Sequence, residues 1–438
     1  MIWGLLTLIS LIGNLPQTDE TPPNIIIITI DTLRADRLPS YGYHRNTAPN
    51  LEKLIARGVR FTHHYTPEPL TAPAMATMLT ARHPHEHGAT RNGITIFEDL
   101  SSLPKTLTRH GYRTAAFVGN WTLRSRLSGL GPHFDDYLEI VSRKRWFGMF
   151  LSEATAKDIT DDALTWLKKR NNQPFAMWLH YVEPHAPYRL HSKYLDQLGL
   201  KKSGGQYTRS ERYDTEIAFC DEQIGRFFEG LEKVSPLEKT IIIFTADHGE
   251  SLGEHGYWGH GRNLYQPSLK VPMAIIWPEA IKPALIKSPS SLIDIPKTVL
   301  GLIGKQKPLD FDGYDWSSTL LHNQMPPANR KLYFQAHRGA AQTRKGADRL
   351  RRRGLLELGM IDGEFKELLR VRNTTRKLHN LINDPDELNS LCDKRSAVTE
   401  GFRRWALEVE QALNRMPAST TDLSSQDIEM LRSLGYIE

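Results

Sequence analysis

The residues best suited to chemistry stand where two apolar segments end. Asn24 to Ile30 (NIIIITI) and Thr240 to Thr245 (TIIIFT) are β-branched runs, which predict strands buried on both faces of a parallel sheet. Asp31 follows the first run, and Asp247 and His248 follow the second. Because open α/β sheets place ligands at the carboxyl ends of their strands, we expect these side chains to meet. Two carboxylates and an imidazole predict a site for one divalent cation, Ca, Zn or Mn.

A hydroxyl at the start of a predicted helix is the second feature. The stretch from Thr71 to Leu79 (TAPAMATML) has Pro73 in its first turn and places Met75, Met78 and Leu79 at helical spacing. Thr71 would be the N-cap, where its oxygen can accept from free backbone N–H groups. That place also faces the positive end of the helix dipole, where an anionic group can bind. These residues leave two interpretations open, a plain cap and a nucleophile.

Two predicted loops carry histidines. His185 lies between two prolines in Val182 to Tyr188 (VEPHAPY), and the prolines hold it in an extended presentation that suits contact with a ligand. Ser251 to Gly261 (SLGEHGYWGHG) includes His260, is rich in Gly and His, and has no strand or helix period. It therefore predicts a functional loop. The alternatives are a surface histidine at 185 and a flexible loop with incidental histidines.

Helices and strands alternate over the first 300 residues, which predicts an α/β fold. The predicted helices span 50–57, 103–110, 159–170, 211–233 and 294–302, and the predicted strands span 24–30, 59–61, 113–118, 175–181, 240–245 and 271–277. Further strands at 331–335, 356–361 and 364–371 and a helix at 397–414 predict a smaller C-terminal α+β domain. We place the boundary near residue 325, in a polar, proline-bearing segment, which divides the chain into 24–325 and 326–438.

Composition fits a globular protein of this size. A chain of 438 residues can form one large domain and a smaller one, and 39% hydrophobic with 24% charged residues argues against wholesale disorder. The net charge of +6 is mild, and the run Arg344 to Arg353 (RKGADRLRRR) is interpreted as a solvated face rather than a nucleic-acid patch. Cys220 and Cys392 form neither a disulfide framework nor a metal-ligand spacing.

The N-terminal residues 1–23 begin with an apolar run, Met1 to Gly13 (MIWGLLTLISLIG). Its length suits the core of an export signal better than a membrane span, which needs about 20 apolar residues. No basic residue precedes the run and no small-x-small cleavage site follows it. We predict a signal peptide and an extracytoplasmic location, periplasmic or secreted. The alternative is a hydrophobic segment that packs on the domain or associates weakly with a membrane.

Several motifs in one order resemble the sulfatase family of the alkaline phosphatase superfamily. Between about Asn24 and Tyr436 they read NIIIITIDTLRAD, TAPAMATMLTARHPHEHG, VEPHAPY, ADHGESLGEHGYWGHG, KVPM, LHNLINDPDE and LRSLGYIE. The resemblance implies a large central mixed β-sheet sandwiched by helices, a smaller C-terminal domain and one divalent cation. It also implies site roles for six residues: Asp31, Asp247 and His248 as metal ligands, Thr71 as nucleophile, and His185 and His260 as contacts of the ester's charged group. His260 stands where many sulfatases have a lysine.

The chain departs from this family at the nucleophile and around the anion. Sulfatases carry a Cys or Ser that is oxidised to formylglycine within C/S-x-P-x-R, whereas this chain has Thr71 and Met75 at the first and last positions. Because threonine is not a substrate for that oxidation, formylglycine is not expected. Thr32 replaces the second Asp of the family's pair. Asn120 and Thr122 replace the cationic groups of its Gly-Lys-Trp-His motif.

Threonine nucleophiles occur in this superfamily in members that cleave or transfer phosphoryl groups. We therefore expect a metal-dependent hydrolase of sulfate- or phosphate-type esters that uses Thr71, with a phosphate-type ester or phosphoryl transfer favoured. One alternative is a catalytically silent sulfatase-fold binding protein, motivated by Met75, Asn120 and Thr122. Another is a sulfuric ester hydrolase that acts without formylglycine. The expected partner is an anionic ester of a small molecule, glycan or lipid, and not a nucleic acid.

Overall fold

The structure is a computed structural model. It describes residues 22–140, 143–145, 150–152, 154–202, 205–308, 310–327, 330–337, 354–392 and 398–416, with 424–425 and 428–429. The predicted export signal and the Arg344 to Arg353 run lie outside these residues. In the described part, no helix is long and apolar enough to cross a membrane.

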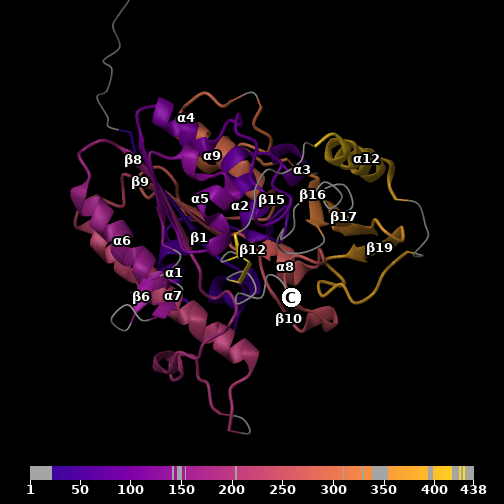
Figure 1. Cartoon of the computed structure of the whole chain (residues 1–438), viewed down its shortest axis with the longest axis horizontal. Helices are drawn as coiled ribbons and strands as arrows, with labels where there is room; N and C mark the ends of the chain where they lie inside the picture. Colours follow the sequence, from indigo (N-terminus) through magenta and orange to yellow (C-terminus); the bar gives the residue numbers. More distant parts are fainter. Residues whose placement is uncertain are drawn as a thin grey trace, which may run out of the picture.

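An eight-stranded sheet forms the centre of the molecule (Figure 1). Its strands, in spatial order, are β14 (Ala284–Ile286), β2 (Val59–Phe61), β13 (Met273–Ile276), β9 (Thr240–Ala246), β1 (Asn24–Ile30), β8 (Phe175–Tyr181), β4 (Arg113–Val118) and β5 (Asp136–Glu139). β1 pairs in parallel with both β9 and β8, whereas β13 is antiparallel to both of its neighbours. The sheet is therefore mixed, which is the expected architecture.

Helices cover both faces of this sheet. On one face lie α2 (Thr71–Thr80), α4 (Leu103–Arg109) and α9 (Ile295–Leu302), and on the other lie α1 (Pro49–Ile55), α6 (Ala156–Lys169) and α7 (Arg209–Glu232) (Figure 1). Side chains alternate across a strand, so Ile25 and Ile27 of β1 enter the first apolar cluster, whereas Ile26 and Ile28 enter the second. A strand buried on both faces has to be apolar at every position, which explains the β-branched run.

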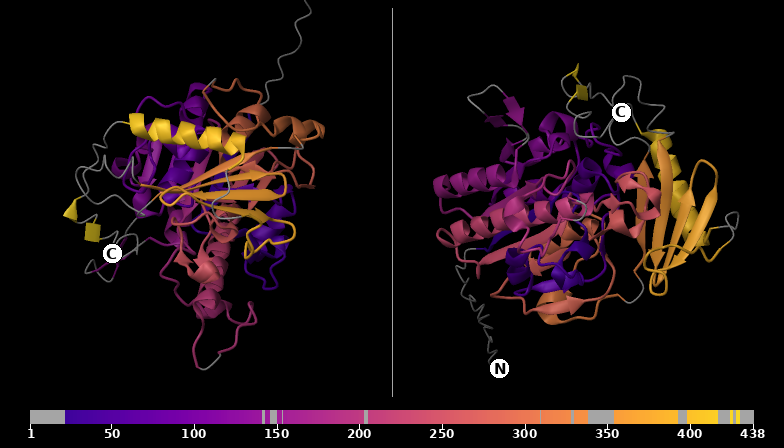
Figure 2. Two further views of the ribbon diagram at one scale, coloured as in Figure 1. Left: turned by 90° about the vertical axis from the view of Figure 1, so that its right-hand side faces the viewer. Right: turned by 90° about the horizontal axis from the view of Figure 1, so that it is seen from below.

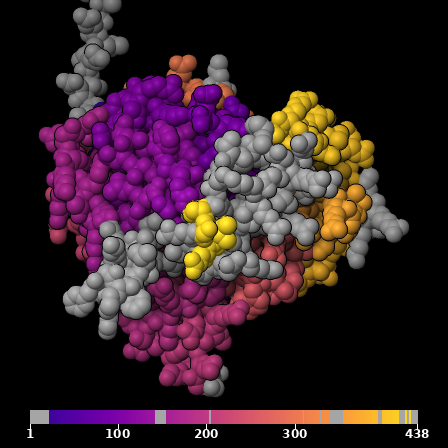
Figure 3. Space-filling model, in the orientation of Figure 1, coloured from indigo at the N-terminus to yellow at the C-terminus, as the bar shows by residue number. Residues whose placement is uncertain are grey.

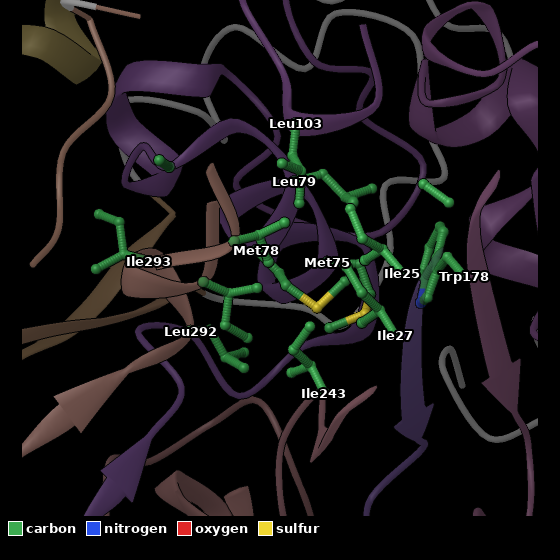
Figure 4. Packing of buried hydrophobic residues seen from close by; sticks show 14 of the residues in the cluster. Ile25, Ile27, Met75, Met78, Leu79, Leu103, Trp178, Ile243, Leu292 and Ile293 are labelled. Carbon is green, nitrogen blue, oxygen red and sulfur yellow. The ribbon is translucent and has the colours of Figure 1, made fainter. Parts of the chain in front are cut away.

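α2 is buried on every side. All ten of its residues are buried. Met75, Met78 and Leu79 point into the apolar cluster formed with Ile25 of β1 and Trp178 of β8 (Figure 4). Because the surroundings of a close-packed helix move little, this packing holds the residue at its N-terminus in a fixed place.

The C-terminal part is a four-stranded antiparallel sheet covered by one helix (Figure 2). The strands are β16 (Leu332–His337), β17 (Leu355–Asp362), β18 (Phe365–Arg370) and β19 (Thr375–Asn380), and the helix is α12 (Glu400–Arg415). Phe402 and Trp405 of α12 pack on Leu358 and Met360 of β17. In the space-filling view this part forms one flank of the molecule (Figure 3). The sequence predicted the first three strands and the helix but missed β19.

Shorter α-helices and strands lie between these elements, together with short 3-10 helices. The shorter α-helices and strands are β3 (His64–Tyr65), α3 (Pro84–His87), α5 (Ser125–Ser128), β6 (Arg143–Arg145), β7 (Phe150–Ser152), β10 (Ser251–Leu252), β11 (Trp258–Gly259), α8 (Gln266–Leu269), β12 (Lys270–Val271), β15 (Ser290–Ser291) and α10 (Ser317–His322). β10 and β11 pair as a small hairpin, so the segment predicted as a loop without strands is partly ordered by backbone pairing. The strand predicted over 271–277 is broken at Pro272, because proline cannot donate to the ladder.

Candidate active site

Asp31, Asp247 and His248 meet at the carboxyl ends of β1 and β9, as predicted. One potential ligand atom from each residue lies within 4.8 Å of the other two, and all three residues are buried. The parallel register of the two strands produces this meeting, because it places Ile30 opposite Ala246, the residues directly before Asp31 and Asp247. In the following turn a Cβ on Gly249 would collide with the carbonyl oxygen of Pro267, so the chain needs glycine there.

His248 presents a lone pair to the cluster. Its Nδ1 lies 2.9 Å from the carbonyl oxygen of Gly249, which can only accept, so Nδ1 carries the proton. Burial and the nearby His260 lower the pKa of His248 far below its ordinary value, which keeps the ring neutral. Nε2 is therefore unprotonated and faces Asp247 Oδ2 at 3.3 Å. This is the tautomer that a metal ligand requires.

The two carboxylates also fit a cation. Asp247 Oδ1 accepts from the backbone N–H groups of Thr32 and His248, at 2.9 and 2.7 Å, which leaves Oδ2 with no hydrogen-bond partner in the described chain. Burial and the neighbouring Asp31 raise the pKa of Asp247 well above its ordinary value. Burial also opposes ionisation of Asp31, but His185 and His180 hold the pKa of Asp31 below its ordinary value. A divalent cation would offset this buried negative charge and occupy the unpartnered oxygens.

Thr71 lies against this cluster and is not a helix cap. α2 begins at Thr71 itself, and the preceding Leu70 has the extended cap conformation, with φ −143° and ψ 136°. No side chain caps the helix at that position. Thr71 Oγ1 lies instead 3.3 Å from His248 Nε2 and is fully buried. The N-cap prediction was therefore wrong, and the hydroxyl is directed toward the proposed ligands.

Both loop histidines reach the same place. The His260 ring lies 4.3 Å from the His248 ring and 5.4 Å from the His185 ring, measured between centroids. His260 Nδ1 contacts Glu250 Oε1 at 3.1 Å. Burial alone would lower the pKa of His260, but the Glu250 carboxylate raises it. His185 Nδ1 contacts the carbonyl oxygen of Ala186 at 2.7 Å, which turns Nε2 away from that carbonyl.

Three further residues belong to the site and were not predicted as members. Asn92 Oδ1 accepts from the backbone N–H of Ala72, at 3.0 Å, and its buried Nδ2 has no hydrogen-bond partner in the described chain. Asn120 Nδ2 donates to Asp31 Oδ2, and His180 Nε2 lies 3.6 Å from the same oxygen. The sequence marked Asn120 only as a departure from a motif, whereas Asn92 and His180 stand in segments that carry no local signal.

The replaced arginine position does not face the site. Met75 is fully buried in the apolar cluster between α2 and the sheet, with Ile27 and Trp178 in that cluster (Figure 4). A methionine there fills the core and leaves no space for a solvated cation. The residues at the two positions where the resemblance leads one to expect further cationic side chains, Asn120 and Thr122, are neutral as well.

Comparisons with known proteins identify the family of the chain. The sequence model described as Sulfatase matches residues 23–305, which is more than half of the chain. The protein belongs to the sulfatase family. A second model, described as N-sulphoglucosamine sulphohydrolase, C-terminal, matches residues 253–406.

Named relatives place this sulfatase-family protein among ester hydrolases. The N-acetylglucosamine-6-O-sulfatase of Bacteroides thetaiotaomicron is 26% identical over 420 residues, covering 72% of this chain and 74% of the relative. An enzyme solved with its substrate D-glucosamine-2-N,6-O-disulfate has a TM-score of 0.70 at 21% identity, covering 95% and 98% of the two chains. The phosphonate monoester hydrolase of Agrobacterium radiobacter has a TM-score of 0.69 at 20% identity, covering 92% and 98%. The protein is a sulfatase-like ester hydrolase of this fold.

Proposed function

We propose that this protein hydrolyses or transfers phosphate-type esters with Thr71 as its nucleophile and one divalent cation as cofactor. The observation that carries the proposal is the position of Thr71 Oγ1, 3.3 Å from His248 Nε2 at the edge of the ligand cluster. Asp31, Asp247 and His248 would hold the cation, which when bound lowers the pKa of a nearby hydroxyl and polarises the ester.

The residues around Thr71 fit an in-line displacement. A bond forms between Thr71 Oγ1 and phosphorus while the bond from phosphorus to the departing alcohol oxygen breaks, and the hydroxyl proton is lost to solvent. His185 and His260 offset charge on the ester oxygens or protonate the departing alkoxide. Asn92 Nδ2 offers a further donor beside the N-terminus of α2. Attack of water on the phosphothreonine releases phosphate and regenerates Thr71, which completes hydrolysis. Attack of an acceptor alcohol instead completes a phosphoryl transfer.

The chemistry of release favours phosphate over sulfate. A sulfated threonine is difficult for water to release, and a threonine cannot become the formylglycine that expels sulfate by elimination. The buried Met75 supplies none of the positive charge that the family's arginine brings, which argues against the family's ordinary sulfatase mechanism. The phosphonate monoester hydrolase named above is an enzyme of the same fold that is named for a phosphorus ester, which supports a phosphate-type ester here. The relatives that act on sulfated sugars favour a glycan-type substrate, with a small molecule or lipid ester as the alternatives.

The test compares Thr71→Ala with Thr71→Ser on phosphate monoesters, phosphate diesters, phosphonates and aryl sulfates. We expect Thr71→Ala to lower kcat/KM by about 10³-fold or more, and Thr71→Ser to retain measurable turnover, because serine keeps the hydroxyl. Mass spectrometry of acid-quenched enzyme should find phosphate on the peptide that contains Thr71.

Three results would redirect the proposal. Unchanged turnover in Thr71→Ala would refute the nucleophile. Turnover of aryl sulfates in preference to every phosphorus ester would favour a sulfuric ester hydrolase that acts without formylglycine. A protein that binds the cation but turns over none of these esters would favour a silent binding protein.

A further inference from the structure

A buried chain of polar contacts runs behind Asp31. Thr29 of β1 stands opposite His180 of β8 in the sheet register. Trp178 Nε1 lies 2.9 Å from Thr29 Oγ1, and Thr29 Oγ1 lies 2.8 Å from His180 Nδ1. On the other side of the imidazole, His180 Nε2 lies 3.6 Å from Asp31 Oδ2. None of these four side chains is more than 1% exposed, so water does not reach the contacts.

The direction of each contact follows from the donors available. The indole N–H of Trp178 can only donate, so Thr29 Oγ1 accepts from it. The single hydroxyl proton of Thr29 can go to His180 Nδ1, at 2.8 Å, or to the carbonyl oxygen of Leu179, at 3.4 Å. The shorter contact makes Nδ1 the acceptor and places the imidazole proton on Nε2, facing Asp31. The opposite tautomer would set the lone pair of Nε2 against the carboxylate, which is unfavourable.

These polar contacts therefore fix the orientation of the Asp31 carboxylate. Asp31 Oδ2 already accepts from Asn120 Nδ2, and His180 Nε2–H faces the same oxygen at 3.6 Å, which is an electrostatic contact longer than a hydrogen bond. Asp31 Oδ1 has no hydrogen-bond partner in the described chain. We propose that His180 is a positioning residue that holds Asp31 Oδ2 and so turns Oδ1 toward the cation. Trp178 and Thr29 act through it by setting its tautomer.

The inference rests on the metal-dependent function proposed above, and one pair of substitutions at Thr29 tests it. Thr29→Val keeps the shape and the β-branching but removes the hydroxyl, whereas Thr29→Ser keeps the hydroxyl. The full-length protein is treated with a chelator and then titrated calorimetrically with Ca²⁺, Mn²⁺ and Zn²⁺ in separate experiments. We expect Thr29→Val to weaken the tightest of these affinities by about 10- to 100-fold, the usual cost of losing a residue that orients a metal ligand. Thr29→Ser should bind that metal nearly as tightly as the wild-type protein.

A second pair of substitutions, at His180, keeps the test decisive if a Thr29 variant does not fold. His180→Gln can place an amide donor near the position of Nε2 and should retain part of the affinity, whereas His180→Leu should lose as much as Thr29→Val. Two-bond ¹H–¹⁵N spectra of ¹⁵N-histidine protein report the tautomer, with the His180 resonance identified by its absence in His180→Leu. The proton should be on Nε2 in the wild-type protein and Thr29→Ser, and redistributed in Thr29→Val.

The alternative is that these polar contacts only provide a hydrogen-bond acceptor for the buried Trp178 N–H. In that case Thr29→Val would lower the melting temperature of the metal-free protein without changing the metal affinity, and that result would overturn the inference. Wild-type protein that binds none of the three metals would overturn it together with the proposed metal site. Metal binding that depends on Thr29, with turnover that does not depend on Thr71, would support His180 while the proposed nucleophile fails.

Discussion

Asp247→Asn separates the structural and the metal-binding roles of one carboxylate. Asp247 Oδ1 accepts two backbone N–H bonds, and an asparagine carbonyl oxygen can accept both of them. The substitution therefore changes only Oδ2, the oxygen that has no hydrogen-bond partner in the described residues. It removes one of two buried negative charges and replaces a potential metal ligand with an amide NH₂.

The expected effects on stability have opposite signs with and without metal. Two unit charges at the 4.8 Å limit of the ligand cluster repel by about 3 kcal/mol at an effective dielectric constant of about 20. Because the raised pKa of Asp247 already relieves part of this repulsion by protonation, we expect the metal-free variant to gain about 1–3 kcal/mol. A metal present at about 100 times its Kd adds about 2.7 kcal/mol to the wild-type protein and almost nothing to the variant.

Thermal unfolding measures both effects. The unfolding entropy of a 438-residue chain is about 0.9 kcal/mol/K, so each kcal/mol shifts the melting temperature by about 1 °C. The metal-free variant should melt about 1–3 °C above the wild-type protein, and the metal-induced rise of about 3 °C should disappear. Asp196→Asn is the matched control, because Asp196 is exposed and the change in net charge is the same. A variant that keeps the full metal-induced rise would refute Asp247 as a ligand.

Three further predictions concern residues around the site and the core. Met75→Arg should lower the free energy of unfolding in urea by about 3–5 kcal/mol, because it buries an unpaired charge. Met75→Leu should lower it by less than about 1.5 kcal/mol. Equal losses in the two variants would contradict the described packing. His64, His87 and His337 are buried, and burial lowers the pKa of each to about 3, so below about pH 6.5 the unfolded chain binds protons that the native protein does not. These three rings should therefore contribute a fall in the free energy of unfolding of about 4 kcal/mol per pH unit between about pH 5.5 and 4, and urea titrations in which His64→Gln leaves the slope of the wild-type protein unchanged would contradict the burial of the His64 ring. Thr32 has a positive φ of 58°, which is strained for a branched residue. Thr32→Asn should therefore raise the free energy of unfolding in urea by about 1 kcal/mol, and a lower value would contradict that strain.

The sequence was sufficient where a local pattern has one physical solution. A continuous β-branched run that ends in aspartate can be buried on both faces only in a sheet covered by helices, which located β1, β9 and the meeting of Asp31 with Asp247. It was insufficient for Thr71, because the cap is defined by backbone angles and the extended angles belong to Leu70. β19 was missed because its residues, TRKLHN, are largely polar and pair at the edge of the small sheet.

The contacts around the carboxylates could not be predicted from local sequence patterns, for a different reason. Asn92 and Asn120 stand far along the chain from the groups they contact, and His180 occupies a position in β8 that looks like ordinary core. Their importance depends on which atoms are brought within hydrogen-bond reach after the sheet forms.

The sequence by itself therefore determined the layers of the fold, the strand ends that carry the proposed ligands and the absence of the family's arginine at position 75. Tertiary structure alone decided that Thr71 Oγ1 faces His248, that Met75 packs in the core, and that Trp178, Thr29 and His180 line up behind Asp31. The physical reason is the distance along the sequence over which each effect acts. Periodicity and β-branching act between residues close in the chain, whereas the orientation of a buried hydroxyl or imidazole depends on donors and acceptors that distant strands bring together.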